Sequence, residues 1–152
     1  MHKTLLLLFL LPLCTINGQT HSEGDVRQAI DDFFEYFHQQ DTVTLRAMLA
    51  DDVQLRSISR NREGEIQMRA QPMDNFLVSL ASIPDTLSFQ EKLLDYQIAI
   101  DGDMATAWTP YEFYLGGNFS HCGVNAFQLY HDGSGWRIIA LADTRRRAGC
   151  KD

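Results

Sequence analysis

The 152-residue sequence lacks an excess of basic residues, because 13 Lys and Arg stand against 20 Asp and Glu for a formal net charge of -7. A general nucleic-acid-binding protein needs a basic face to displace phosphate counterions, so that class is excluded. The sequence also lacks internal repeats, long linkers and low-complexity tracts. Its 45% hydrophobic and 22% charged residues match an ordinary globular chain, which excludes intrinsic disorder as the main state.

Long hydrophobic runs are scarce. The main one, Leu5–Leu13, is too short to span a bilayer as a stable anchor. Lys3 precedes it and Gly18 follows it, which is the pattern of a secretory signal peptide. We therefore predict a signal peptide at residues 1–18, one domain at residues 19–152, and export to the periplasm or the extracellular space. The alternative for the leader is a buried N-terminal helix.

Cysteines are also few: Cys14, Cys122 and Cys150. Cys14 could accept a lipid, although the residue before it, Leu13, is not the small residue that lipoprotein signals usually carry. An oxidising compartment permits a disulfide between the other two cysteines. A straight final strand would hold them too far apart, whereas a turn at Ala148-Gly149 would bring them together, so the bond stays open at this point.

Several motifs of cofactor chemistry are missing. The His and Cys residues show no zinc-binding spacing, and the neighbours His121 and Cys122 would point to opposite faces of a strand. No phosphate-binding loop, dinucleotide fingerprint or Ser-His-Asp context is present. The sequence therefore predicts no metal site and no cofactor.

The hydrophobic pattern places helices first and strands later. Apolar residues from Val26 to Phe37 recur at helical spacing after Asp25, which can cap the helix. Pro110 indicates an edge or a bulge in its strand. The expected elements are helices from 25, from 41 or 42 and over 73–81, a loop at 60–66, and strands at 53–59, 89–100, 104–115, 119–131 and 136–145. This order predicts an α+β fold in which an antiparallel meander packs on the helices.

Three segments carry a family resemblance: AWTPYEFYLGG at 107–117, FSHCGVNAFQLYHDGSGWRI at 119–138 and IALADTRR at 139–146. With them the chain resembles the nuclear transport factor 2-like superfamily, and most closely its secreted bacterial proteins grouped as lumazine-binding or polyketide-cyclase-like (SnoaL-type). The resemblance implies a cone-shaped domain, in which a curved antiparallel sheet wraps N-terminal helices and leaves a pocket at the open end. It also implies small organic molecules as partners, which relatives isomerise, dehydrate, cyclise or simply bind. Many relatives pair as homodimers through the outer sheet face.

The candidate catalytic residues are His121 and Asp143, since a pocket that moves protons needs a group titrating near neutral pH and a partner that orients it. Arg145 lies on the same strand face as Asp143 and could hold an anionic ligand group or neutralise that carboxylate. The alternative is a structural ion pair at the end of the sheet.

The face of His121 depends on the register of the last hairpin. A loop that pairs His131 with Gly135 brings His121 to the face of Asp143. A loop that pairs His131 with Trp136 moves it to the other face, because a register slip of one residue moves every side chain of a strand to the opposite face of the sheet. The Asp-Gly-Ser-Gly sequence supports either loop.

Trp108, Tyr111 and Phe113 are the candidate ligand-binding aromatics, with core packing as the alternative. The leading hypothesis is an exported small-molecule-binding protein that performs acid–base chemistry, such as an isomerisation or a dehydration. The alternatives are a non-catalytic binding module for a flat heteroaromatic ligand, and a dimeric interaction protein with a vestigial pocket.

Overall fold

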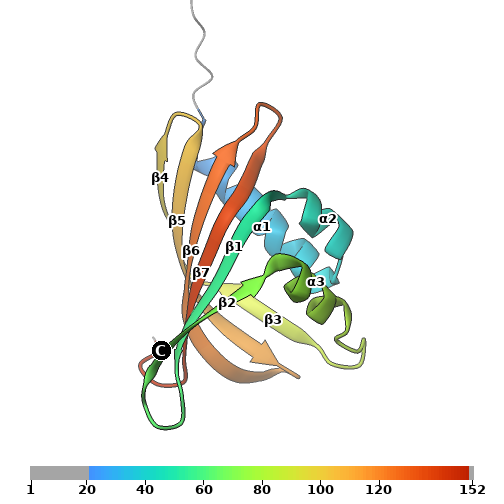
Figure 1. Cartoon of the computed structure of the whole chain (residues 1–152), viewed down its shortest axis with the longest axis vertical. Helices are drawn as coiled ribbons and strands as arrows, with labels where there is room; N and C mark the ends of the chain where they lie inside the picture. The colour runs from blue at the N-terminus through green and yellow to red at the C-terminus, as the bar shows by residue number, and fades with distance from the viewer. Residues whose placement is uncertain (1–20, 151–152) are drawn as a thin grey trace, which may run out of the picture.

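The computed structural model describes residues 21–150 and arranges them as helices packed inside a curved sheet (Figure 1). The predicted signal peptide and Cys14 lie outside the described residues. Within residues 21–150, no helix combines the length and the apolar composition needed to cross a membrane. The elements run in the order α1 (Glu23–Gln39), α2 (Thr42–Ala47), β1 (Leu49–Arg60), β2 (Ile66–Pro72), α3 (Met73–Ala81), β3 (Phe89–Leu93), β4 (Gln97–Asp101), β5 (Met104–Leu115), β6 (Asn118–His131) and β7 (Trp136–Arg146).

Helix α1 begins with a capping box. Ser22, rather than the predicted Asp25, is the N-cap: its hydroxyl accepts from Asp25 N, and the Asp25 carboxylate accepts from Ser22 N. The two side chains thereby each accept from a backbone donor of the other residue, which fixes the start of the helix. The predicted apolar stripe is confirmed, because Val26, Ile30, Phe33 and Phe34 are all buried. The rings of Phe33 and Phe34 each make an edge-to-face contact with Phe127 in the sheet.

Two boundaries differ from the sequence prediction. β1 begins at Leu49 instead of residue 53, because β7 already captures the chain there: Ile138 N donates to Met48 O at 3.0 Å. The strand expected over residues 89–100 is broken into β3 and β4, which both pair with β5. The break lies opposite Pro110, whose carbonyl accepts from Leu94 N and which has no N–H to continue the ladder.

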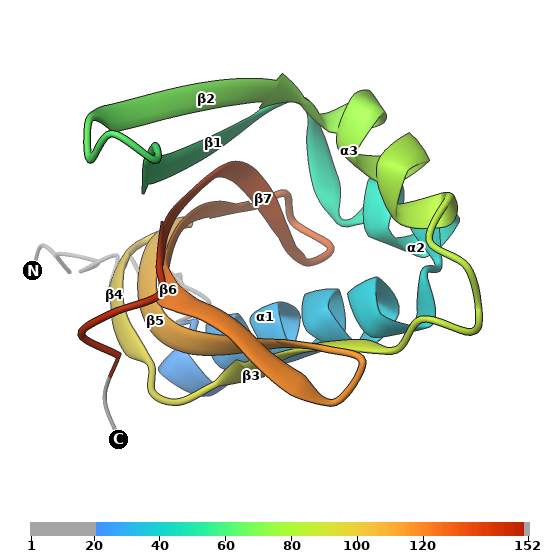
Figure 2. The same cartoon turned by 90° about the horizontal axis from the view of Figure 1, so that it is seen from below.

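The sheet has the strand order β2-β1-β7-β6-β5-β3, with β4 also paired to β5. It curves around α1 and remains open (Figure 2). The predicted α+β cone is confirmed. All pairs are antiparallel except β1 and β7, which run parallel. The face that holds Phe127 and Leu129 against the helices is called concave below, and the opposite face convex.

The β6–β7 hairpin begins in the second register considered above but does not keep it, and further along Gly123 pairs with Arg145 rather than with Asp143 as the first register would require. His131 pairs with Trp136 at the turn, but the pairing shifts by one residue at Ile139 of β7. Beyond this bulge, Asn125 pairs with Asp143. Because the bulge restores the parity that the turn removes, His121 lies on the concave face with Asp143.

A disulfide joins Cys122 to Cys150, with Cα atoms 5.8 Å apart. β7 ends at Arg146, and the tail then turns back through Gly149, whose φ of 67° lies in the left-handed region that glycine favours. The turn considered at Ala148-Gly149 is thus the alternative that the structure adopts.

Candidate functional site

A row of polar side chains crosses four strands of the concave face. Ser57 of β1 pairs with Asp143 of β7, Asp143 pairs with Asn125 of β6, and Asn125 pairs with Thr109 of β5. Paired residues project from the same side of a sheet, so these four side chains lie side by side. We call Ser57, Asp143, Asn125 and Thr109 the polar row.

The polar row is buried next to an apolar core. Thr109 is 0%, Asn125 4% and Asp143 6% exposed, and they are the buried polar residues of the described chain. Within residues 21–150, the buried hydroxyls of Ser57 and Thr109 have no hydrogen-bond partner. Leaving a buried polar group unpaired costs about 1–3 kcal/mol. The row therefore offers unused hydrogen-bonding capacity at an energetic cost, which is a feature of functional sites more than of structural cores.

Glu91 contacts the polar row from β3, a strand that lies apart in sequence from the strands that carry the row. Its Oε1 accepts from Asn125 Nδ2 at 2.6 Å, and its backbone N donates to His38 Nε2 at 2.9 Å. Burial raises the pKa of Glu91 from 4.5 to about 7, and the nearby Asp143 charge acts in the same direction, while the Asn125 hydrogen bond and the Arg145 charge oppose them. A carboxyl group with this pKa can both accept and donate a proton at neutral pH.

Asp143 is held by two neighbours. Arg145 Nε donates to Asp143 Oδ2 at 2.7 Å, so Arg145 neutralises this carboxylate, one of its two predicted roles. The Tyr111 hydroxyl donates to Thr144 O at 2.9 Å and lies 3.4 Å from the same Oδ2. Burial raises the pKa of Tyr111, so the phenol stays protonated and remains a donor.

Gly123 makes the position of Tyr111 possible. A Cβ at this residue would lie 1.7 Å from Thr144 O and 2.7 Å from Tyr111 Cε1. The tyrosine ring therefore occupies space that any other residue at position 123 would fill.

His121 lies at the outer rim of this cluster. Its ring stacks on Phe113 at 4.9 Å and meets Tyr111 edge to face at 5.8 Å, and its Nδ1 is 3.1 Å from Ser120 Oγ. Burial and the Arg145 charge lower the pKa of His121, which favours the neutral imidazole. Within residues 21–150, no hydrogen bond joins His121 directly to Asp143.

A hollow of about 410 Å³ lies at the edge strand β3. His38 and Phe89 line it, and they connect it to Glu91 through the His38 hydrogen bond and through the chain. The remaining lining residues are Ser88, Gln90, Tyr114 and Gly117. Glu91 is not among the residues that line this hollow, and its hydrogen bond with His38 is made through the backbone N rather than the carboxyl group.

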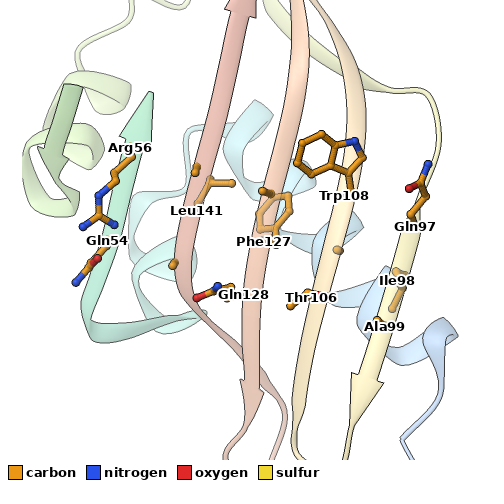
Figure 3. A pocket seen from close by; sticks show the side chains of 14 residues that line it. Gln54, Arg56, Gln97, Ile98, Ala99, Thr106, Trp108, Phe127, Gln128 and Leu141 are labelled. Carbon is orange, nitrogen blue, oxygen red and sulfur yellow. The ribbon is translucent and has the colours of Figure 1, made fainter. Parts of the chain in front are cut away.

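Trp108 does not share the site with the other predicted residues. It lies on the convex face, 47% exposed, because it is three positions from Tyr111 along an unbroken part of β5, and residues an odd number of positions apart point to opposite faces. Figure 3 shows its indole beside a second hollow of about 480 Å³, with Gln54, Arg56 and Gln128 among the lining side chains. Tyr111, Phe113, His121, Asp143 and Arg145 all lie on the concave side.

The sequence prediction missed Ser57, Glu91, Thr109 and Asn125. For Thr109 a signal existed, since it alternates in phase with Tyr111 along one strand. Glu91 and Ser57 gave none, because their positions depend on how β3 and β1 pair with strands far away in the sequence.

Comparison with known proteins identifies the fold. No family model and no curated protein matches the chain. The β subunit of benzoate 1,2-dioxygenase from Burkholderia mallei superposes with a TM-score of 0.69 at 11% identity, over 88% of this chain and 97% of that one. An NTF2-like protein from Cytophaga hutchinsonii superposes with a TM-score of 0.64 at 17% identity, over 83% of this chain and 100% of that one. A proposed scytalone dehydratase from Novosphingobium aromaticivorans superposes with a TM-score of 0.63 at 9% identity, over 85% of this chain and 94% of that one. The chain therefore has the nuclear transport factor 2-like fold that the sequence resemblance implied.

Proposed function

We propose that the protein is exported and binds a small organic molecule against the polar row, where Glu91 and Asp143 perform acid–base chemistry with His121 at the rim. The observation that carries this proposal is a carboxyl group with a pKa of about 7, hydrogen-bonded to a buried row in which two hydroxyls have no protein partner. A ligand with hydroxyl or carbonyl oxygens would use those hydroxyls. The proposed dehydratase among the fold neighbours supports this reaction class by analogy only.

Glu91 is suited to moving a proton between two carbons of the ligand. Its carboxylate removes a proton from a carbon next to a carbonyl group and returns it to another carbon, which is an isomerisation without any co-reactant. Asn125 fixes the orientation of the carboxyl group through the 2.6 Å hydrogen bond. The Asp143–Arg145 pair sets the local charge, and neutral His121 can polarise a ligand oxygen at the rim.

A ligand screen followed by site variants tests the proposal. Hydroxylated aromatics, pterins and flavins are added to the chain and the melting temperature is recorded, because a ligand that binds only the folded state raises it. We expect Glu91→Gln to keep binding and to lower turnover of the hit by about 100-fold or more, as loss of a general base does. Trp108→Ala, on the convex face, is the matched control and leaves both unchanged.

A second candidate function rests on Trp108 itself. Its half-exposed indole beside the convex hollow favours a non-catalytic module that binds a flat heteroaromatic ligand by stacking. The same variants separate the two functions: a melting shift that disappears in Trp108→Ala and persists in Glu91→Gln without any turnover supports the module and refutes the acid–base proposal. Export is tested separately by sequencing the N-terminus of the secreted chain, which should begin at residue 19.

A further inference from the structure

A second group of titratable side chains lies at the end of the sheet that carries the β4–β5 and β6–β7 turns (Figure 1). His21 precedes α1, Asp103 lies in the β4–β5 turn, and His131 ends β6. Each residue offers one ligand atom, and these atoms lie within 4.8 Å of one another. The backbone bond from His131 N to Asp103 O, at 2.8 Å, fixes two of the three segments against each other.

The closest pair in this group already has the spacing of metal ligands. His21 Nε2 lies 3.0 Å from Asp103 Oδ1. Zinc–ligand bonds of about 2.0–2.1 Å in a tetrahedron place neighbouring ligand atoms about 3.3 Å apart. A cation could therefore take the place of the proton that the imidazole and the carboxylate share.

His131 completes the donor set. Its ring stacks on His21 with centroids 4.1 Å apart, and one of its nitrogens lies within 4.8 Å of the His21 and Asp103 ligand atoms. Nδ1 accepts only a long bond of 3.2 Å from Gly133 N, which a metal can replace. Two imidazoles and one carboxylate form a donor set that zinc accepts, with a fourth position left for water or another ligand.

The surroundings provide both room and a spare donor. A hollow of about 680 Å³ adjoins the two histidines and is also lined by Asp25, Asp32 and Trp136. The buried indole N–H of Trp136 has no hydrogen-bond partner within residues 21–150, so it is available to a group bound in this hollow. The Asp25 carboxylate is already engaged in the capping box of α1.

We propose that His21, Asp103 and His131 bind one divalent transition metal ion, with Zn²⁺ as the best fit, and that the ion ties the segment before α1 to the two turns. Linear spacing could not predict this site, because 82 residues separate His21 from Asp103. The site is independent of the polar row, which lies further along β5 and β6.

Calorimetric titration of the untagged chain with ZnCl₂ in metal-free buffer at neutral pH tests the proposal. We expect one ion per chain and a melting temperature that rises with added Zn²⁺. Co²⁺ should give the visible absorption of a tetrahedral site containing nitrogen and oxygen ligands. Binding of no ion, or of several ions with no effect on melting, would overturn the proposal.

Two variants identify the ligands. Asp103→Asn and His131→Gln should weaken Zn²⁺ binding by more than the roughly 10–100-fold that loss of an outer-shell partner alone costs. Asp101→Asn, an exposed carboxylate two residues from Asp103, is the matched control and should bind as the unaltered chain does. Circular dichroism without metal confirms that each variant folds. Equal affinities for the Asp103 and Asp101 variants would refute the assignment.

Discussion

Replacement of Glu91 by Gln should remove a pH-dependent loss of stability. The folded chain holds the pKa of Glu91 at about 7, whereas the usual value of 4.5 applies when the chain unfolds. Between these values the folded state binds more protons than the unfolded state, so the free energy of unfolding falls as the pH rises. The pKa difference corresponds to about 3 kcal/mol, which is fully lost above about pH 7.

The expected result is therefore a difference between the two proteins that depends on pH. Near pH 4.5 both carry a neutral side chain that can accept from Asn125, and their stabilities should be similar. Near pH 8, Glu91→Gln should be more stable than the unaltered chain by up to about 3 kcal/mol.

Urea unfolding at a series of pH values measures this difference. Glu63→Gln, an exposed residue at the tip of the β1–β2 hairpin, is the control and should show no pH-dependent gain. Arg145→Gln should move the transition to higher pH, because it removes the positive charge that lowers the pKa of Glu91. If the gain from Glu91→Gln is the same at pH 5 and pH 8, the buried-carboxyl explanation is wrong.

Three further predictions concern stability and use the same urea assay. Gly123→Ala should lower the free energy of unfolding by about 1–3 kcal/mol or more, because its Cβ would lie 1.7 Å from Thr144 O. An unchanged free energy of unfolding would show that the strands can separate at no cost. Replacing Cys122 and Cys150 together by Ser should cost about 3.5 kcal/mol for a bridge that spans 28 residues, and reductant should then no longer affect the protein. Ser22→Ala should cost about 1 kcal/mol through loss of the N-cap, and an unchanged unfolding midpoint would contradict the capping box.

Much of the fold follows from local signals. The bounds of α3, Met73–Ala81, agree with the prediction because its apolar stripe ends just before Pro84. The glycine turns after Asp101 and Leu115 likewise locate the ends of β5. The break between β3 and β4 was harder to predict, although Pro110 indicated an irregularity, because its effect falls on the neighbouring strand rather than on its own.

The candidate site was predictable only within single strands. Alternation placed Asp143 and Arg145 on one face, and the structure confirms this. Their relation to His121 needed the bulge at Ile139, which no turn sequence encodes. Glu91 was not predicted because its hydrogen bond with Asn125 depends on how the edge strand β3 pairs with β5, which no local sequence signal indicates.

The extra residue Ile139 has a consequence for how the chain can vary in length. It makes β7 longer by one than the stretch of β6 that it accompanies. Deleting Ile139 would remove the bulge and leave the other β6–β7 pairs in place, so that Asp143 would still face inward beside Asn125. β7 can therefore lose one residue at this point and keep its inward and outward faces, whereas the same deletion in a regularly paired strand would reverse the faces of everything beyond it.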